Sequence, residues 1–296
     1  MAPSLPPIDP TIKNLLGNSY WGFVCSAVLC GVSVIQGYLY FTRNNDKLGF
    51  NLFVGCLLGL DISTTSVWAY ILYRLLILNI RNSNTLAISN TYFTADSSMT
   101  LVITLFTQIF FAHQVYLVMT KRRVVVPAVI TFFAILGFVS GAIRISTVRH
   151  APGKWSRYKL STTLEGLFFA FSDITASAAM CFLFASAAKE SKRLSSALKS
   201  LTIYTVNRGI LVTSAQILLV ALYLWQPTKF YWSPFHITLS KLYVNTLLAM
   251  LNSRPSLRSK AGINNDGGTT LQGVDHLTRG DSHEVSETKH SDGGHV

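Results

Sequence analysis

Long apolar blocks, separated by short polar segments, run through most of the chain. A helix needs about 20 apolar residues to cross the hydrocarbon core of a bilayer. Seven blocks reach this length, at residues 18–41, 50–78, 97–120, 124–148, 161–188, 200–224 and 231–251. A membrane β-barrel would show alternating segments of about 10 residues instead. The pattern therefore predicts an all-α, polytopic integral membrane protein built as a bundle of seven transmembrane helices.

The polar ends of the chain are expected to lie outside this bundle. Residues 1–17 are predicted to form a short extracellular or lumenal N-terminus, and residues 18–251 the transmembrane domain. In residues 252–296 the apolar blocks give way to Gly, Asn, Asp, Ser and His. Such a composition cannot bury enough apolar surface to fold, so a disordered cytosolic tail is predicted there.

Composition supports the membrane class, because 50% of the residues are hydrophobic and only 13% are charged. The positions of Lys and Arg predict the orientation. With the N-terminus outside, the short cytosolic segments hold twelve of these residues and the outer segments seven, although the loop at 149–159 holds four of those seven. Cytosolic loops are usually the more basic. We therefore expect a multi-pass protein of the plasma membrane or an endomembrane, with the N-terminus out and the C-terminus in the cytosol.

The net charge of +12 has an ordinary explanation in this setting. Basic inner loops attract anionic lipid headgroups, and the lipid bilayer is the expected partner. No module of interleaved aromatic and basic residues predicts nucleic-acid binding. Two inner loops provide candidate contacts for a cytosolic partner protein, at Lys121, Arg122, Arg123, Lys192 and Arg193.

The last apolar block contains a lysine near its middle, within "HITLSKLYVNTLLAMLNSR". Thr238, Lys241, Asn245 and Asn252 follow one another at steps of three, four and seven, so they share one stripe of a helix. A lysine near the bilayer midplane costs about 2.5–3.5 kcal/mol on insertion scales. We therefore expect this stripe to face the bundle interior and Lys241 to have an acidic partner.

Asp61, near the middle of the second block, is the first choice of partner, and Asp173 in the fifth block is the second. An ion pair would offset part of the cost of burying both charges. Two interpretations of such a pair are equally favoured: a structural contact that fixes helix packing, and part of a site for a ligand, an ion or a proton. The candidate intramembrane polar site comprises Asp61, Gln108, Asp173, Lys241 and Asn245. Outside it, Glu165 and Arg208 are expected to reach the outer and inner membrane surfaces.

Several chemistries are not predicted. Only His113 and His236 fall within the seven blocks, at opposite ends, so no metal site is expected. No G-x-S-x-G or similar nucleophile motif occurs, so we do not expect an enzyme, and no cofactor is implied. A retinal Schiff base on Lys241 is an alternative, but the third block contains no acid that would serve as its counterion.

Four stretches carry a resemblance to a known family: "GYLYFTRNNDKLGFNLFVGCLLGLD", "LFTQIFFAHQVYLV", "LTIYTVNRGILVTS" and "LSKLYVNTLLAMLNSR". In these the chain resembles a family of fungal seven-transmembrane proteins catalogued as domain of unknown function 6534. The resemblance implies a seven-helix architecture, and it implies that six residues occupy family-typical positions: Asp61, Asn207, Lys241, Tyr243, Asn245 and Asn252. At Gln114 this chain departs from the basic residue expected in the family.

Three functions remain open from the sequence. A receptor-like sensor would bind a small-molecule ligand among the interior polar residues and signal through the basic inner loops. A small-molecule or proton-coupled transporter would use Asp61, Asp173 and Lys241 as exchanging charges. A structural or lipid-organising membrane protein would need only the helix packing. The helix count and the predicted orientation favour the receptor.

Overall fold

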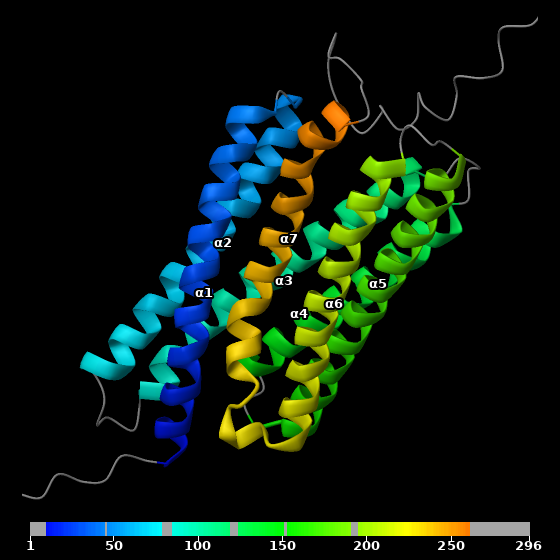
Figure 1. Cartoon of the computed structure of the whole chain (residues 1–296). Helices are drawn as coiled ribbons and strands as arrows, with labels where there is room; N and C mark the ends of the chain where they lie inside the picture. Colours follow the sequence, from blue (N-terminus) through cyan, green and yellow to red (C-terminus); the bar gives the residue numbers. More distant parts are fainter. Residues whose placement is uncertain are drawn as a thin grey trace, which may run out of the picture.

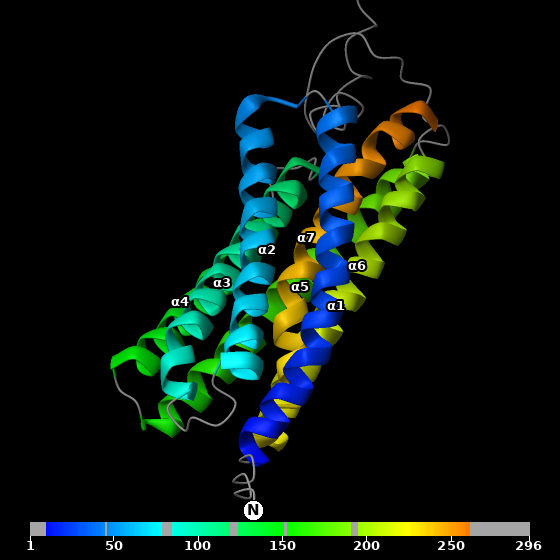
Figure 2. The same cartoon turned by 90° about the vertical axis from the view of Figure 1, so that its left-hand side faces the viewer.

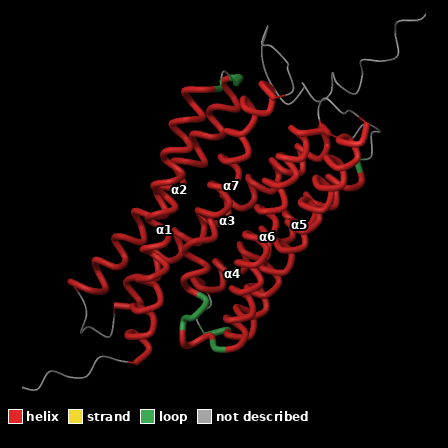
Figure 3. Tube along the Cα trace, viewed as in Figure 1, coloured by secondary structure: helices red, strands yellow, loops and turns green. Residues whose placement is uncertain are grey.

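The computed structural model of the chain describes residues 10–44, 46–78, 85–118, 124–150, 153–190 and 195–260. Within these ranges it is helical and contains no strand (Figure 3). The long helices are α1 (Pro10–Arg43), α2 (Leu48–Tyr73), α3 (Thr85–Val118), α4 (Val125–His150), α5 (Trp155–Glu190), α6 (Ser195–Trp225) and α7 (Ser233–Lys260). A π-helical turn, η1 (Arg74–Leu78), extends α2, and a 3₁₀ turn, η2 (Pro227–Lys229), joins α6 to α7.

The helices form a closed bundle in which each contacts the next along the chain and α7 returns to α1. In Figure 1, α1 and α2 form one flank and α4, α5 and α6 the other, with α3 and α7 between them. Figure 2 shows α1 from the side, with its N-terminal end at the same end of the bundle as the start of α7. The α6–α7 turn therefore lies at the end of the bundle where α1 begins.

Helices α1 to α6 are each long and apolar enough to cross a membrane. Their outward surfaces carry large hydrophobic side chains that are exposed, among them Trp21 and Ile35 on α1, Phe132 on α4 and Phe182 on α5. Water penalises such faces whereas lipid tails accept them. The chain is therefore an α-helical membrane protein.

Helix α7 differs from the other six because protein surrounds it. It contacts α1, α2, α3 and α6, and no residue from Ser233 to Arg254 is exposed. Polar side chains on α7 consequently meet partners on neighbouring helices instead of lipid. This explains why α7 tolerates a polar content that keeps it below the apolarity of α1 to α6.

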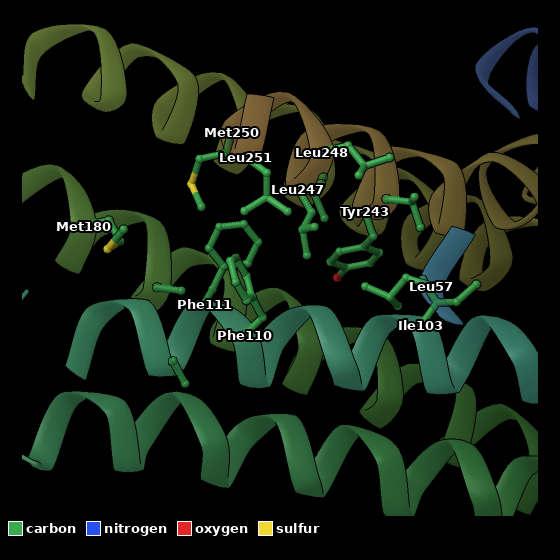
Figure 4. Close-up of a cluster of buried hydrophobic side chains, with 14 of the residues drawn as sticks. Leu57, Ile103, Phe110, Phe111, Met180, Tyr243, Leu247, Leu248, Met250 and Leu251 are labelled. Atoms are coloured by element: carbon green, nitrogen blue, oxygen red, sulfur yellow. The ribbon is translucent and has the colours of Figure 1, made fainter. Parts of the chain in front are cut away.

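A large buried apolar cluster lies mainly in the half of the bundle toward the end of α7, and Figure 4 shows part of it. Phe110 and Phe111 of α3 pack beside Leu247 and Leu251 of α7, and Tyr243 closes this cluster on one side. Tyr243 is fully buried, and its hydroxyl group donates a hydrogen bond to Asp173.

Three boundaries differ most from the sequence-based prediction. Helix α1 begins at Pro10, before the predicted 18, so the second half of the predicted N-terminal segment 1–17 is helical. Helix α3 begins at Thr85, well before the predicted 97, and this brings Asp96 into the helix. Helix α7 continues to Lys260, past the predicted end at 251, so the first part of the predicted tail is helical. The remainder of that tail, residues 261–296, and residues 1–9 lie outside the described residues.

Candidate functional site

Lys241 of α7 and Asp61 of α2 form an ion pair in the middle of the bundle. The Nζ atom of Lys241 lies 2.9 Å from Asp61 Oδ1. It also donates hydrogen bonds to the main-chain carbonyl of Asp61 and to Thr64 Oγ1, the latter at 2.6 Å. Both charged side chains are at most 1% exposed. The three donors of the ammonium group are thus engaged within α2, which compensates its removal from water.

The two asparagines of the same stripe hold α7 against α1. Asn245 Nδ2 lies within hydrogen-bond distance, 2.9 Å in each case, of the Leu29 carbonyl, Ser33 Oγ and the Lys241 carbonyl. Asn252 Nδ2 donates to the Gln36 carbonyl at 2.8 Å. The predicted stripe therefore faces the interior, with Lys241 turned to α2 and the asparagines turned to α1.

Asp173 of α5 is at the centre of a second polar cluster, which we call the Asp173 cluster and define as Gln108, Asp173, Arg208 and Tyr243. Arg208 Nη2 lies 2.9 Å from Asp173 Oδ1, the Tyr243 hydroxyl donates to Oδ2, and Gln108 Nε2 lies 3.4 Å from the same oxygen. The cluster joins α3, α5, α6 and α7 through one carboxylate.

Arg208 does not reach the inner membrane surface, contrary to the prediction. It is 3% exposed, and its guanidinium group lies over the ring of Phe111, with Cζ 3.4 Å from the ring centroid. The aromatic face and the Asp173 carboxylate together compensate the buried charge. A snorkelling arginine would have left Asp173 without a cation.

Glu165 was predicted to reach the headgroups, and this is also wrong. Arg144 of α4 donates to both of its carboxylate oxygens, from Nε at 2.6 Å and from Nη2 at 3.3 Å. Arg144 is 8% exposed, and its Nη1 also lies 3.4 Å from Ser97 Oγ. The sequence reasoning passed over Arg144, although an arginine inside an apolar block is itself a signal of a functional or pairing residue.

A cavity of about 570 Å³ occupies the half of the bundle where α1 begins. Its walls come from all seven long helices, and aromatic side chains make up much of them: Trp68, Phe93, Trp155, Tyr158, Phe169, Tyr223, Phe230 and Trp232. The charged residues that line it are Asp96, Arg144, Lys154 and Glu165, together with the titratable His236. Its size falls within the range of small-molecule sites, about 300–1,000 Å³.

The cavity lies next to the Asp173 cluster, on the side of the cluster that faces the end of the bundle where α1 begins. Thr104, Phe169 and Leu239 line it, and each precedes a cluster residue by four positions, namely Gln108, Asp173 and Tyr243. Four residues are about one turn of an α-helix. Three helices therefore run from the cavity wall into the cluster within a single turn, and α2 does the same from Trp68 to Thr64, the partner of Lys241.

None of the five predicted site residues lines this cavity. These residues lie next to the cavity and are engaged with one another or with α1. Lys241 pairs with Asp61, and Asp173 pairs with Arg208. Gln108 contacts Asp173, and Asn245 contacts α1. Lys241 does not line this cavity, and its ammonium group is engaged by Asp61 and Thr64. The structure does not describe the predicted inner-face residues Lys121, Arg122, Arg123, Lys192 and Arg193.

The cavity residues escaped the sequence analysis for identifiable reasons. Asp96 lies one position before the predicted start of the third span, so it was never considered as an interior acid. His236 was treated as a single residue near a helix end, whereas its Nε2 lies 3.5 Å from Asp96 Oδ2. His113, by contrast, is exposed on the outside of α3. Within the described residues no group of three potential metal ligands occurs.

Comparison with known proteins identifies a family match for part of the chain. Residues 170–256 match a family of unknown function, DUF6534. This segment covers most of α5, all of α6 and most of α7, and it contains Asp173, Arg208, Lys241 and Tyr243. No curated protein and no solved structure matches the chain.

Proposed function

We propose that the protein is a seven-helix membrane receptor or sensor, which binds a small molecule in the cavity and transmits the event through the Asp173 cluster. The observation that carries this proposal is the position of the cavity, one helical turn above buried charges that join four helices. A ligand that displaces Thr104, Phe169 or Leu239 would move residues that are directly coupled to these charges. Packed interiors respond to such displacements by switching between discrete arrangements.

The orientation follows from the distribution of basic residues. With the N-terminus outside, the cavity opens toward the extracellular or lumenal side, because it lies at the end where α1 begins. At the opposite end, Arg254 of α7 lies 3.7 Å from Asp46, between α1 and α2, and the Tyr40 hydroxyl donates to Asp46 at 2.9 Å. In this orientation a movement of α7 would change this pair, and a cytosolic partner would sense that change.

A search for ligands with a built-in control tests the proposal. The thermal stability of purified full-length protein would be measured against a library of drug-sized molecules. Hits would be repeated on Thr162→Trp, which fills the cavity, and on Thr163→Trp. These adjacent threonines each donate to a carbonyl four residues earlier, but only Thr162 lines the cavity.

The expected result is a hit that raises the melting temperature of wild type and of Thr163→Trp, but not of Thr162→Trp. The same hit should not accumulate in proteoliposomes that contain the protein. Stabilisation that survives Thr162→Trp would contradict binding in the cavity. Saturable uptake of the hit would make the protein a carrier, whose exchanging charges would be Asp61, Asp173 and Lys241.

A further inference from the structure

We propose that the cavity takes an organic cation, a protonated amine with an aromatic body, whose ammonium group binds Asp96. This inference rests on the proposed function, since it specifies the ligand of the same cavity. It follows from the charges that line the cavity, from the aromatic rings near Asp96 and from one buried acceptor, Gln216 Oε1, that has no hydrogen-bond partner.

Asp96 and Glu165 are the two carboxylates that line the cavity, and they differ in how they are compensated. Glu165 receives two hydrogen bonds from Arg144. Asp96 is 3% exposed, and His236, which pairs with it at 3.5 Å, carries a charge only when protonated. A buried carboxylate is costly without a cation and hydrogen-bond donors. An ammonium group from a ligand would supply both.

Aromatic rings surround this carboxylate on two sides. On the α2–α3 side, Phe93 lies one turn before Asp96 and stacks edge-to-face on Trp68, with their centroids 5.5 Å apart. On the α7 side, Trp232 lies 6.1 Å from the ring of His236. All four rings line the cavity. The faces of such rings attract cations, and organic ammonium groups in particular.

The other polar groups of the cavity also favour a ligand that donates hydrogen bonds over an acidic ligand. Gln216 is 3% exposed, lines the cavity, and its Oε1 has no hydrogen-bond partner. It is therefore a second buried acceptor, which an N–H or O–H group of the ligand would satisfy. An anionic ligand meets a less suitable site, because the Arg144 guanidinium group already donates to Glu165 and Ser97, and Lys154, the other cation of the lining, is exposed to solvent.

Three probes with one indole body test the charge preference: tryptamine, tryptophol and indole-3-acetate, which carry an ammonium, a hydroxyl and a carboxylate group. Their affinities for full-length protein in lipid nanodiscs would be measured by titration calorimetry. We expect tryptamine to bind at least about tenfold more tightly than the other two. Asp96→Asn should reduce tryptamine affinity by about tenfold or more, because it removes one partner of a buried charge pair.

Two variants control the experiment. Thr163→Trp, one position outside the cavity lining, should leave tryptamine affinity unchanged, whereas Thr162→Trp should abolish binding. Equal affinity for the three probes, or tryptamine binding that Asp96→Asn does not weaken, would overturn the amine assignment. If tryptophol or indole-3-acetate binds best and Thr162→Trp blocks it, the ligand cavity stands and only the amine assignment fails. Absence of binding by any of the three probes overturns the amine assignment and leaves the receptor proposal to the wider ligand search.

Discussion

At the scale of single residues, the interior charges of the bundle are matched between helices. Asp61 pairs with Lys241, Asp173 with Arg208 and Glu165 with Arg144, and no pair lies within one helix. An unpaired charge inside a membrane bundle is expensive, while a pair with good geometry recovers much of the cost. Each pair therefore favours one arrangement of the two helices that it joins.

Breaking the Lys241–Asp61 pair should destabilise the bundle. Lys241→Met and Asp61→Asn each leave one buried partner uncompensated, which costs about 3–5 kcal/mol. The double variant removes both charges and should recover most of that loss. Thermal unfolding of the purified variants in detergent measures the difference.

The comparison of single and double variants also separates structure from function at this pair. Single variants that unfold at the wild-type temperature would contradict a structural role, and Lys241 would then be available for ligand or ion chemistry. A double variant as unstable as the sum of the two single ones would show that the residues act independently.

The sequence led to this pair because Lys241 and Asp61 both stand near the middle of long apolar blocks. It did not lead to the Arg144–Glu165 and Asp173–Arg208 pairs, because Glu165 and Arg208 were assigned to the membrane surfaces and Arg144 lies near the end of its block. Asp173 was predicted as an interior acid, but with Lys241 as its partner. Snorkelling and pairing predict the same sequence pattern for a residue near a span end. Only the packing of α3 to α6 distinguishes them.

At the scale of helices, α1 and α7 approach closely along their length. A Cβ atom on Gly22 would lie 2.7 Å from Pro234 Cα, and Ser19 and Ser233 share a hydrogen bond of 2.8 Å between their hydroxyl groups. Asn245 and Asn252 continue the contact further along. Small residues allow helices to pack at such short range in membranes.

Gly22→Ala should separate these two helices and lower stability by about 1–3 kcal/mol, the usual cost of overpacking. Gly31→Ala provides a matched control on the same helix, because a Cβ there meets nothing within 4 Å. The control should be neutral or stabilising by up to about 1 kcal/mol, owing to the better helix propensity of alanine. Equal melting temperatures of the two variants would contradict the close α1–α7 contact.

The sequence predicted the helices well and their ends less well. Apolar length alone located all seven long helices of the described chain, because lipid contact requires uninterrupted apolar faces. It placed the start of α3 too late, since the first turns of this helix are polar and include Asp96. It predicted a span at α7 from its apolar residues. This helix is surrounded by protein, and its polar residues make the contacts with α1 and α2.

At the scale of the whole molecule, polar and apolar layers alternate along the bundle. The cavity occupies the end where α1 begins, and the Asp173 cluster and the Lys241–Asp61 pair follow. The apolar core around Phe111, Leu247 and Leu251 lies beyond them. The pocket is therefore separated from the opposite end of the bundle by the buried charges and the apolar core. A receptor can keep this arrangement, whereas a carrier must open it to release its substrate.

Accessibility of two positions one turn apart tests this account most directly. Single cysteines would replace Thr104, in the cavity wall, or Gln108, in the cluster beneath it, after Cys25, Cys30, Cys56 and Cys181 are changed to alanine. A membrane-impermeant thiol reagent would then be applied to either side of oriented membranes. We expect the cysteine at 104 to react from the side of the N-terminus only, and the cysteine at 108 to react from neither side. Reaction of either cysteine from the cytosolic side would contradict a closed ligand pocket.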